Sequence, residues 1–522
     1  MKYLKRQIDK EFEAWKSSVE HKPLLVRGAR QVGKSSAIRH LGESFPYFLE
    51  VNFERDKTVK EFFDGDLNVK FISEQLSAYF KVPVIPGKTL LFLDEIQACP
   101  NAIHSLWFFK EDYPELHVVA AGSLLEFALK DLGAYGVGRI RSMFVYPMSF
   151  DEFLYALGDD GLVSMKRNAT SQKPLMNVFY ERLVERFRSF LLIGGMPAAV
   201  AKYVDTNSYL EVDSVLSELK QTYIDDFVKY KAKVNPVLLR QTLFSVAHQV
   251  GSKFVFSQVE GGYTTAQVKN ALEMLRDAGI IIPVWHTAAN GIPLGAEINP
   301  KFVKYNLIDH GFLLNLLGIG DSTNSIVKEL LVDNAADLVD KGSLTEMVAG
   351  LELLKYMSPN ERHDLYYWQN LTRGTVSEVD YVLSRGIDIV PMEVKSGLRG
   401  SMASLYVFME KEHIKYAIRC SLENFGEFVS PKGKKILVNP LYAISNLFFC
   451  QAGGHRLLQG AGPHRCRADH PHRQPEQEIH GRQYGAGDEV LCEGHCGPRG
   501  LERHLPHRQR GRRDQRLCLQ RQ

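Results

Sequence analysis

The pattern of apolar and polar positions changes along the chain, and its first part alternates between short apolar runs and helix-compatible stretches. Apolar runs of strand length occupy 23–26, 47–53, 88–95 and 117–123. The run that ends at residue 94 is apolar without alternation, as in a strand covered on both faces. Strands that alternate with helices predict an α/β region built on a parallel sheet.

The pattern from about residue 150 to about residue 280 is helical. Near its end, Thr264 and Gln267 form a capping box that opens a helix, Gly279 ends that helix, and an apolar strand occupies 280–285. A short helix, a Gly-Gly turn, a second helix and a strand follow the order of a winged helix-turn-helix.

Two functions remain open for this winged-helix-like unit. Its second helix exposes only Lys269 and Arg276 as cations, and Glu273 and Asp277 partly offset them. The unit therefore either reads DNA or serves as a protein-interaction or lid module.

A third pattern begins with an amphipathic helix at 340–354. Two strand-like runs follow at 377–383 and 387–395, and the turn Ser-Arg-Gly at 384–386 between them predicts a hairpin. The last part of the folded chain is therefore expected to be a second α/β region.

The segment between the first apolar run and the first helix carries the strongest chemical signal. It reads Gly-Ala-Arg-Gln-Val-Gly-Lys-Ser over 28–35, between a strand and a helix, which is the context of a phosphate-binding P-loop. Lys34 would reach the phosphates and Ser35 would offer a hydroxyl to Mg²⁺. The expected nucleotide-binding residues are Gly28, Ala29, Arg30, Gln31, Val32, Gly33, Lys34, Ser35 and Ser36.

The ends of two later strands add polar groups to this site. Asp94 lies 60 residues after Lys34 and would hold Mg²⁺, while Glu95 would activate the attacking water. The alternative is that this acidic pair caps the next helix. Ser123 would either touch the γ-phosphate or the water, or act as the N-cap of the following helix.

A fifth strand is predicted at 138–147, entered through Arg139 and Arg141. Either arginine is a candidate for stabilising the γ-phosphate in the transition state, from the same or a neighbouring subunit. A solvated arginine pair is the alternative.

These motifs resemble those of one family. GARQVGKS, LLFLDE, AAGSLLEF, GRIRSMFVYPMSFDEFL and the Ile-Gly-Gly-Met-Pro string at 193–197 are similar to motifs of prokaryotic AAA-type ATPases that carry an uncharacterised C-terminal domain. The resemblance covers about residues 1–448. It implies an AAA-like core that uses ATP and Mg²⁺.

The hairpin carries a second candidate site. Asp380, a spacing of twelve residues and then Glu393-Val-Lys395 resemble the core of PD-(D/E)XK nucleases, and Glu346 would be the helix-borne acid of the set. In that resemblance Glu346, Asp380 and Glu393 hold a divalent metal, and Lys395 helps to position or activate the water. The alternatives are a surface hairpin with a Glu/Lys pair, or a related fold that only binds.

Composition separates the last residues from the rest. The apolar content is 45% and the net charge is +3. Residues 451–522 contain thirteen Arg, eight acidic residues, four Cys and no Lys, a net charge of +5, which leaves −2 for the remainder. This tail is interpreted as a basic nucleic-acid-binding arm, a zinc site or an out-of-frame translation, and the last interpretation is favoured. The near-neutral remainder offers no bulk argument for nucleic-acid binding.

The sequence has no run of 18 apolar residues and no apolar N-terminal segment, which predicts a cytoplasmic protein without a membrane span.

The predicted function is an ATPase whose activity is coupled to a nuclease-like domain that acts on nucleic acid. The alternative is a regulatory ATPase whose distal domains bind protein; DNA, a protein and a second copy of the chain are candidate partners. The predicted fold is multidomain α/β, with an AAA-like core at 1–155, a helical lid or linker at 156–235, a winged-helix-like region at 236–325, a PD-(D/E)XK-like domain at 326–448 and an atypical tail at 449–522.

Overall fold

A computed structural model describes residues 3–123, 125–132, 138–318, 342–370, 377–397 and 400–448 of the 522-residue chain. The tail at 449–522, with its candidate zinc ligands, lies outside the described residues, as does Cys450. Cys99 and Cys420 are buried free thiols.

The first region is a five-stranded sheet in the order β2-β3-β4-β1-β5, and every neighbouring pair is parallel. The predicted α/β region with a parallel sheet is therefore confirmed. Because the strands are parallel, their carboxyl ends share one edge, where ligands of open α/β sheets bind. The strands are β1 (Leu24–Arg27), β2 (Tyr47–Asn52), β3 (Thr89–Asp94), β4 (His117–Ala121) and β5 (Arg141–Phe144).

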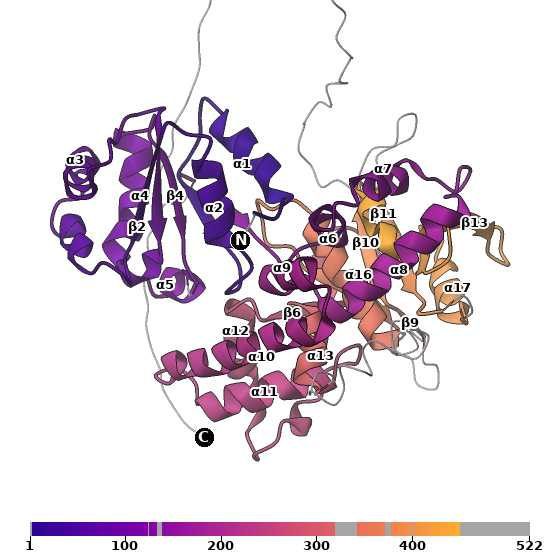
Figure 1. Ribbon diagram of the computed structural model, residues 1–522. Coiled ribbons are helices and arrows are strands. Elements are labelled where there is room, and N and C mark those ends of the chain that lie inside the picture. Colours follow the sequence, from indigo (N-terminus) through magenta and orange to yellow (C-terminus); the bar gives the residue numbers. More distant parts are fainter. Residues whose placement is uncertain are drawn as a thin grey trace, which may run out of the picture. The chain divides into compact units, whose positions relative to one another are not determined.

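Helices cover both faces of this sheet, which explains its continuous apolar runs. Figure 1 shows α1 and α2 on one side of the strands and α3 and α4 on the other. Along β3, Leu90 and Phe92 pack into the core on the α1/α2 side, whereas Leu91 and Leu93 pack into the core on the α3/α4 side. The helices are α1 (Ile8–Lys16), α2 (Lys34–Gly42), α3 (Val69–Phe80), α4 (Pro100–Asp112) and α5 (Leu125–Leu132).

The middle region is helical, as predicted, and ends in a hairpin. The capping box of Thr264 and Gln267 is present at the start of α12, and Gly279 follows that helix with a φ of +73°. β6 and β7 then form an antiparallel hairpin. The elements are α6 (Phe150–Ala156), α7 (Asp160–Asn168), α8 (Asn177–Ile193), α9 (Pro197–Thr206), α10 (Tyr209–Asp226), α11 (Pro236–His248), α12 (Thr265–Asp277), β6 (Ile281–Thr287), β7 (Ile298–Leu307) and α13 (His310–Leu316).

The last region contains the predicted hairpin, in which Tyr381 of β10 lies opposite Met392 of β11. It belongs to a five-stranded sheet in the order β10-β11-β12-β14-β13. A four-stranded sheet, β7-β6-β8-β9, joins this region to the middle one, because β8 pairs with β6. The elements are α16 (Gly342–Tyr356), β8 (Leu365–Gln369), β9 (Glu378–Val379), β10 (Tyr381–Arg385), β11 (Asp388–Val394), α17 (Ala403–Met409), β12 (Tyr416–Ser421), β13 (Gly426–Val429) and β14 (Lys435–Pro440).

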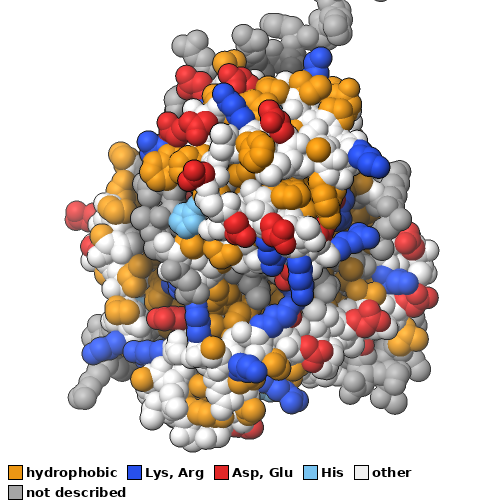
Figure 2. Space-filling view, turned by 90° about the vertical axis from the view of Figure 1, so that its left-hand side faces the viewer, with side chains coloured by type: hydrophobic (Ala, Val, Ile, Leu, Met, Phe, Trp, Pro, Cys, Tyr) orange, Lys and Arg blue, Asp and Glu red, His pale blue; other side chains and the backbone are white. Residues whose placement is uncertain are grey.

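The surface agrees with the near-neutral charge of the folded part. Figure 2 shows basic and acidic side chains mixed over the face that it presents. Among the described residues, no helix is both long enough and apolar enough to cross a membrane.

Candidate functional site

The loop after β1 has the backbone that a P-loop requires. Gly28 and Gly33 have φ values of +143° and +93°, in the region that favours glycine. A Cβ on Gly28 would lie 2.2 Å from the carbonyl oxygen of Val145, so a larger residue cannot fit there. The loop leads directly into α2, whose N-terminal N–H groups attract anions.

Lys34 is the first residue of α2, and its side chain folds back over the loop. Its Nζ donates hydrogen bonds to the carbonyl oxygens of Gly28 (3.0 Å) and Ala29 (2.8 Å). Burial lowers the pKa of this ammonium to about 8, against the opposing charges of Glu95 and Asp94. The loop therefore holds a buried cation whose partners are neutral carbonyls.

Asp94, at the end of β3, is placed next to the serine of the loop. Ser35 Oγ donates to Asp94 Oδ1 at 3.2 Å, and Asn52 Nδ2 donates to Asp94 Oδ2 at 3.0 Å. Burial, followed by the charge of Glu95, raises the pKa of Asp94 above its ordinary value. A hydroxyl and a carboxylate in contact are hard oxygen donors, which Mg²⁺ prefers, so this pair fits the metal of a nucleotide complex.

Glu95 points to the end of the neighbouring strand. Its Oε2 accepts hydrogen bonds from the Ser123 hydroxyl (3.1 Å), the Ser123 N–H (3.3 Å) and Gln97 Nε2 (2.6 Å). Gly122 permits this approach, because a Cβ there would lie 1.9 Å from the Gln97 side-chain oxygen. The structure thus brings together the predicted residues Lys34, Ser35, Asp94, Glu95 and Ser123.

Arg139 and Arg141 lie away from this group. Arg141 begins β5 and pairs with Leu24, the first residue of β1, so both arginines are at the amino edge of the sheet. Arg139 Nε contacts Glu111 Oε1 at 2.5 Å, and its guanidinium lies over the ring of Trp107. Within one chain they are at the opposite edge from the P-loop, so the two predictions that fit this position are a role from a neighbouring subunit and a solvated arginine pair.

Two of the three predicted metal ligands of the last region, Glu346 and Asp380, lie in one group of carboxylates, whereas the third, Glu393, is not part of that group. The carboxylates of Glu346 on α16, Glu378 on β9 and Asp380 lie within 4.8 Å of one another. Asp380 Oδ2 accepts a hydrogen bond from the N–H of Val394 at 2.7 Å. Lys395 Nζ lies 2.5 Å from Glu393 Oε1, as expected from two side chains on one face of a strand.

A buried lysine that sequence reasoning missed occupies part of this acidic cluster. Lys304 of β7, whose side chain is 2% exposed, pairs with Glu346 (2.8 Å) and with Glu378. Burial alone would lower the pKa of Lys304, but the charges of Glu346 and Glu378 outweigh it and raise that pKa. Glu378 was missed as well, although it stands two residues before Asp380.

Three carboxylates in and beside this cluster are harder to ionise than ordinary carboxyl groups, because they are buried. Glu393 Oε2 is buried and has no hydrogen-bond partner. Burial raises the pKa of Glu346 to about 8, and burial with the nearby charge of Asp380 raises the pKa of Glu393 to about 7. The pKa of Asp380 is raised by burial too.

Comparison with known proteins matches each of the three regions to a different family model. Residues 20–154 match the model of a family described as an AAA domain. The later regions match two domains of unknown function, DUF8612 over residues 184–323 and DUF4143 over residues 341–443. The P-loop, its acidic partners and the parallel strand order all lie within the first match and agree with it. Residues 20–154 form a P-loop AAA-type ATPase domain.

Solved structures add little to this assignment. The Walker-type ATPase PABY2304 of Pyrococcus abyssi is similar at 15% identity and a TM-score of 0.38, over 60% of this chain and 96% of that one. The ORC1 protein of Aeropyrum pernix in complex with DNA is similar at 13% identity and a TM-score of 0.26, over 63% of this chain and 95% of that one. TM-scores this low support no inference about this chain. No curated protein sequence matches it.

The P-loop of the AAA domain is clamped by an arginine that sequence reasoning also missed. Arg6 donates from Nη1 to the Val32 carbonyl (2.9 Å) and from Nη2 to the Tyr146 carbonyl (2.7 Å). Its Nε pairs with Glu152 at 3.0 Å. Glu152 completes a capping box with Ser149 at the start of α6, a pattern that is visible in the sequence. The N-terminal segment thereby ties the loop to α6, the helix at the carboxyl end of the AAA domain.

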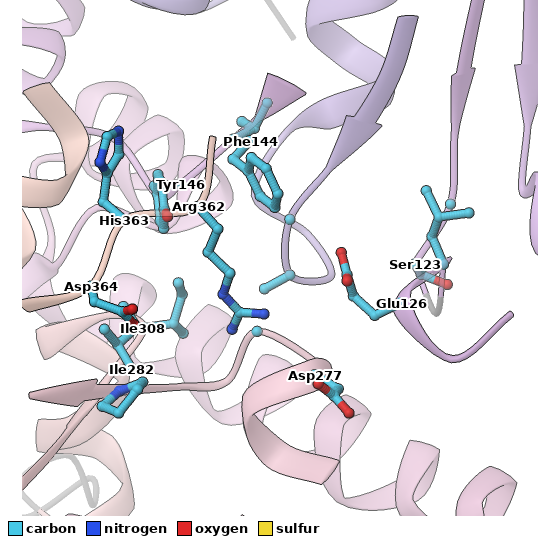
Figure 3. Close-up of a pocket in the computed structure, with 17 residues that line it drawn as sticks. Ser123, Glu126, Phe144, Tyr146, Asp277, Ile282, Ile308, Arg362, His363 and Asp364 are labelled. Carbon is cyan, nitrogen blue, oxygen red and sulfur yellow. The ribbon is translucent and has the colours of Figure 1, made fainter. Parts of the chain in front are cut away.

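The AAA domain shares a cavity with both later regions. The cavity measures about 670 Å³, part of it open to solvent, and Gly28 and Ser123 line it from the AAA domain. Figure 3 shows Arg362 extending into it toward Glu126 and Asp277. All three regions of the chain therefore meet beside the P-loop.

Proposed function

We propose that the chain hydrolyses ATP with Mg²⁺ at the P-loop of the AAA domain. The observation that carries the proposal is the position of Glu95, hydrogen-bonded to Ser123 and adjacent to the Ser35–Asp94 pair. This arrangement places a carboxylate, a metal-binding oxygen pair and a phosphate cradle at one edge of the sheet.

Each residue has a distinct role in this reaction. The loop N–H groups and the Lys34 ammonium bind the β- and γ-phosphates, and Ser35 with Asp94 would hold Mg²⁺, which neutralises phosphate charge when bound. Glu95 accepts the proton of the attacking water, and Ser123 fixes the orientation of the Glu95 carboxylate.

Two substitutions test the assignment. Lys34→Ala is expected to abolish ATP binding, whereas Glu95→Gln keeps ATP affinity within about threefold and lowers kcat about 100-fold or more. The matched control is Glu43→Gln, because the Glu43 side chain is 73% exposed at the other end of α2. Unchanged turnover in Glu95→Gln would refute the proposed base.

We propose a second function for the acidic cluster, a nuclease-like site that binds a divalent metal. When Glu346, Glu378, Asp380 and Glu393 are all ionised, these carboxylates and the ammonium groups of Lys304 and Lys395 sum to a formal charge of −2. The raised pKa values of Glu346 and Glu393 mean that bound protons offset part of this charge while no cation is bound. A divalent cation would balance that charge. The unpartnered Glu393 Oε2 supports a ligand position beside Asp380.

The test of this site measures metal and cleavage separately. Titration of the full chain with Mn²⁺ in the absence of nucleotide is expected to show binding that is lost in Glu393→Gln. DNA and RNA cleavage is expected to require Mn²⁺ or Mg²⁺ and to fail in Lys395→Ala. Metal binding without cleavage would favour the alternative, a regulatory ATPase whose distal regions bind protein.

The contacts of α12 are relevant to the alternative in which the distal regions bind protein. Arg276, one of its two cations, lies 3.7 Å from Asp364, and Asp277 pairs with Lys130 of the AAA domain. The carboxyl end of α12 therefore contacts both neighbouring regions. This packing favours the lid or interaction role over direct reading of DNA for that end of the helix.

The proposed coupling runs through α16. Glu352 accepts a hydrogen bond from the N–H of Phe150 at 3.1 Å, and Lys355 donates to the carbonyl of Met148 at 3.0 Å. Glu346 of the acidic cluster lies on the same helix, about 9 Å along its axis from Glu352. A shift of the segment around Met148 and Phe150, at the carboxyl end of the AAA domain, would therefore move a cluster residue.

A further inference from the structure

The side chain of Arg30 in the P-loop is held by the middle region. Arg30 Nη1 forms an ion pair with Asp226 Oδ2, and Tyr223 Oη donates to the Arg30 carbonyl at 2.8 Å. Tyr223 and Asp226 both belong to the last turn of α10. The carboxyl end of α10 thus contacts both the backbone and the guanidinium of Arg30.

Arg30 lies on the side of the loop where the catalytic groups stand. Arg30 and Ser123 line one small hollow, and Ser123 Oγ contacts Glu95 at 3.1 Å. The pKa of Arg30 is raised: burial lowers it, but its hydrogen bond with Asp226 and the charges of Asp226 and Glu95 outweigh that effect. The guanidinium is therefore close enough to Glu95, the proposed base, for the two charges to interact.

We propose that Arg30 is the arginine that stabilises the transition state of ATP hydrolysis within the same chain, and that Asp226 restrains it. The inference rests on the proposed ATPase function. The water oxygen forms a bond to the γ-phosphorus while the bond from that phosphorus to the bridging oxygen breaks. ADP leaves with the electron pair, and the water proton passes to Glu95. Negative charge that spreads over the γ-phosphate oxygens is neutralised by the planar guanidinium.

The ion pair of Asp226 allows this arginine to be released. Asp226 Oδ1 also lies 2.9 Å from Lys229 Nζ, so the carboxylate keeps a cationic partner when Arg30 turns to the phosphate. The Arg30 side chain is 26% exposed and that of Asp226 is 12% exposed, so the ion pair is only partly buried. Separation of the pair therefore leaves no unpaired buried charge, which is the main cost of breaking such contacts.

Regulation follows from the position of Asp226. α10 belongs to the region that matches the domain of unknown function over residues 184–323. A partner or ligand that moves the end of α10 would free Arg30 and raise the rate of hydrolysis. The middle region is thereby assigned a restraining role toward the AAA domain.

The experiment compares Arg30→Ala, Arg30→Lys and Asp226→Asn in the full chain, with Arg182→Ala as the control because that exposed arginine pairs only within α8. Arg30→Ala is expected to lower kcat about 100-fold or more with ATP affinity within about threefold. Its affinity for ADP with aluminium fluoride falls, while its affinity for ADP alone is unchanged. Arg30→Lys stays well below wild type because it lacks the planar fork, and Asp226→Asn raises kcat.

Two results would overturn the inference while the ATPase proposal stands. One is an active wild type in which Arg30→Ala keeps kcat within about threefold. The other is a rate per chain that rises with protein concentration and is lost in Arg139→Ala, which would place the arginine in a neighbouring subunit. A wild type that binds but never hydrolyses ATP would overturn the proposed function and this inference together.

Discussion

The P-loop and the acidic cluster each contain a buried lysine beside carboxylates, yet the lysines have different partners. Lys34 donates to the carbonyls of Gly28 and Ala29, while Lys304 pairs with Glu346 and Glu378. The lysine of the first site keeps its charge uncompensated by direct ion pairs. Lys304, in the second site, pairs with two carboxylates at once.

This difference predicts ligands of opposite charge for the two sites. In the AAA domain, Asp94 and Glu95 accept hydrogen bonds from Ser35 and Ser123, and the loop still presents N–H groups and Lys34 to phosphate. In the acidic cluster, negative charge remains after both lysines are counted, and a divalent cation would balance it. The same residue types thus serve opposite purposes, depending on what the lysine contacts.

The largest effect is expected from Lys304→Met, which leaves the carboxylates of Glu346 and the partly exposed Glu378 without their cation. The free energy of unfolding should fall by about 3–5 kcal/mol at pH 8 in EDTA, measured by urea denaturation. Mn²⁺ should restore stability to this variant more than to wild type. Lys301→Met, an exposed lysine on the same strand, is the control. A loss below about 1 kcal/mol would contradict the proposed charge balance.

Lys34→Met should act in the opposite direction on stability. Because burial lowers the pKa of Lys34 to about 8, the folded state holds the proton less tightly than the unfolded state. This penalty is fully present below pH 8 and fades as the pH rises toward the ordinary lysine value. The nucleotide-free variant should therefore gain up to about 3 kcal/mol at pH 7, and ATP should no longer raise its melting temperature.

Lys10→Met, at an exposed position on α1, controls for the loss of a lysine. A nucleotide-free Lys34→Met chain less stable than wild type would show that the carbonyl contacts of Lys34 outweigh its burial.

A smaller effect is expected from pH on the acidic cluster. The pKa values of Glu346 and Glu393, raised to about 8 and about 7, mean that the folded state binds these protons more tightly than the unfolded state. Stability in EDTA should therefore fall from pH 6.5 by about 1.4 kcal/mol per pH unit for each group, up to about pH 7 for Glu393 and up to about pH 8 for Glu346, and level off above pH 8. Thermal melts across this range measure the effect.

Mn²⁺ should reverse the fall, because it binds the deprotonated carboxylates, and Glu393→Gln should flatten it. Stability that is constant between pH 6.5 and 8.5 in EDTA would argue against a strained acidic cluster in the folded chain.

Local patterns were enough to predict the sheet and the P-loop. Glycines at 28 and 33, an apolar run before Asp94 and a capping box at Thr264 are contained within a few consecutive residues, so each could be recognised without knowledge of the fold. The strands and α12 follow these predictions. The hairpin that carries Asp380 and Glu393 was local as well.

The contacts that join the regions could not be found in this way. Arg6 and Glu152 are 146 positions apart, and Arg30 and Asp226 are 196 apart. Lys304 stands in a strand with one other lysine, Lys301, and no local pattern marks Lys304 as the buried one. Such pairs exist only because the fold brings distant segments together. Asp226 was therefore missed, and the sequence named Arg30 for nucleotide binding but assigned the transition-state role to Arg139 or Arg141.

The most direct test of the account identifies the nucleotide left on the chain after a single turnover. Excess protein is incubated with radiolabelled ATP and Mg²⁺, separated from free nucleotide and analysed. Wild type should carry ADP, and Glu95→Gln should carry intact ATP, because it binds the substrate without the base that activates water. ADP on Glu95→Gln at the wild-type rate would contradict the account.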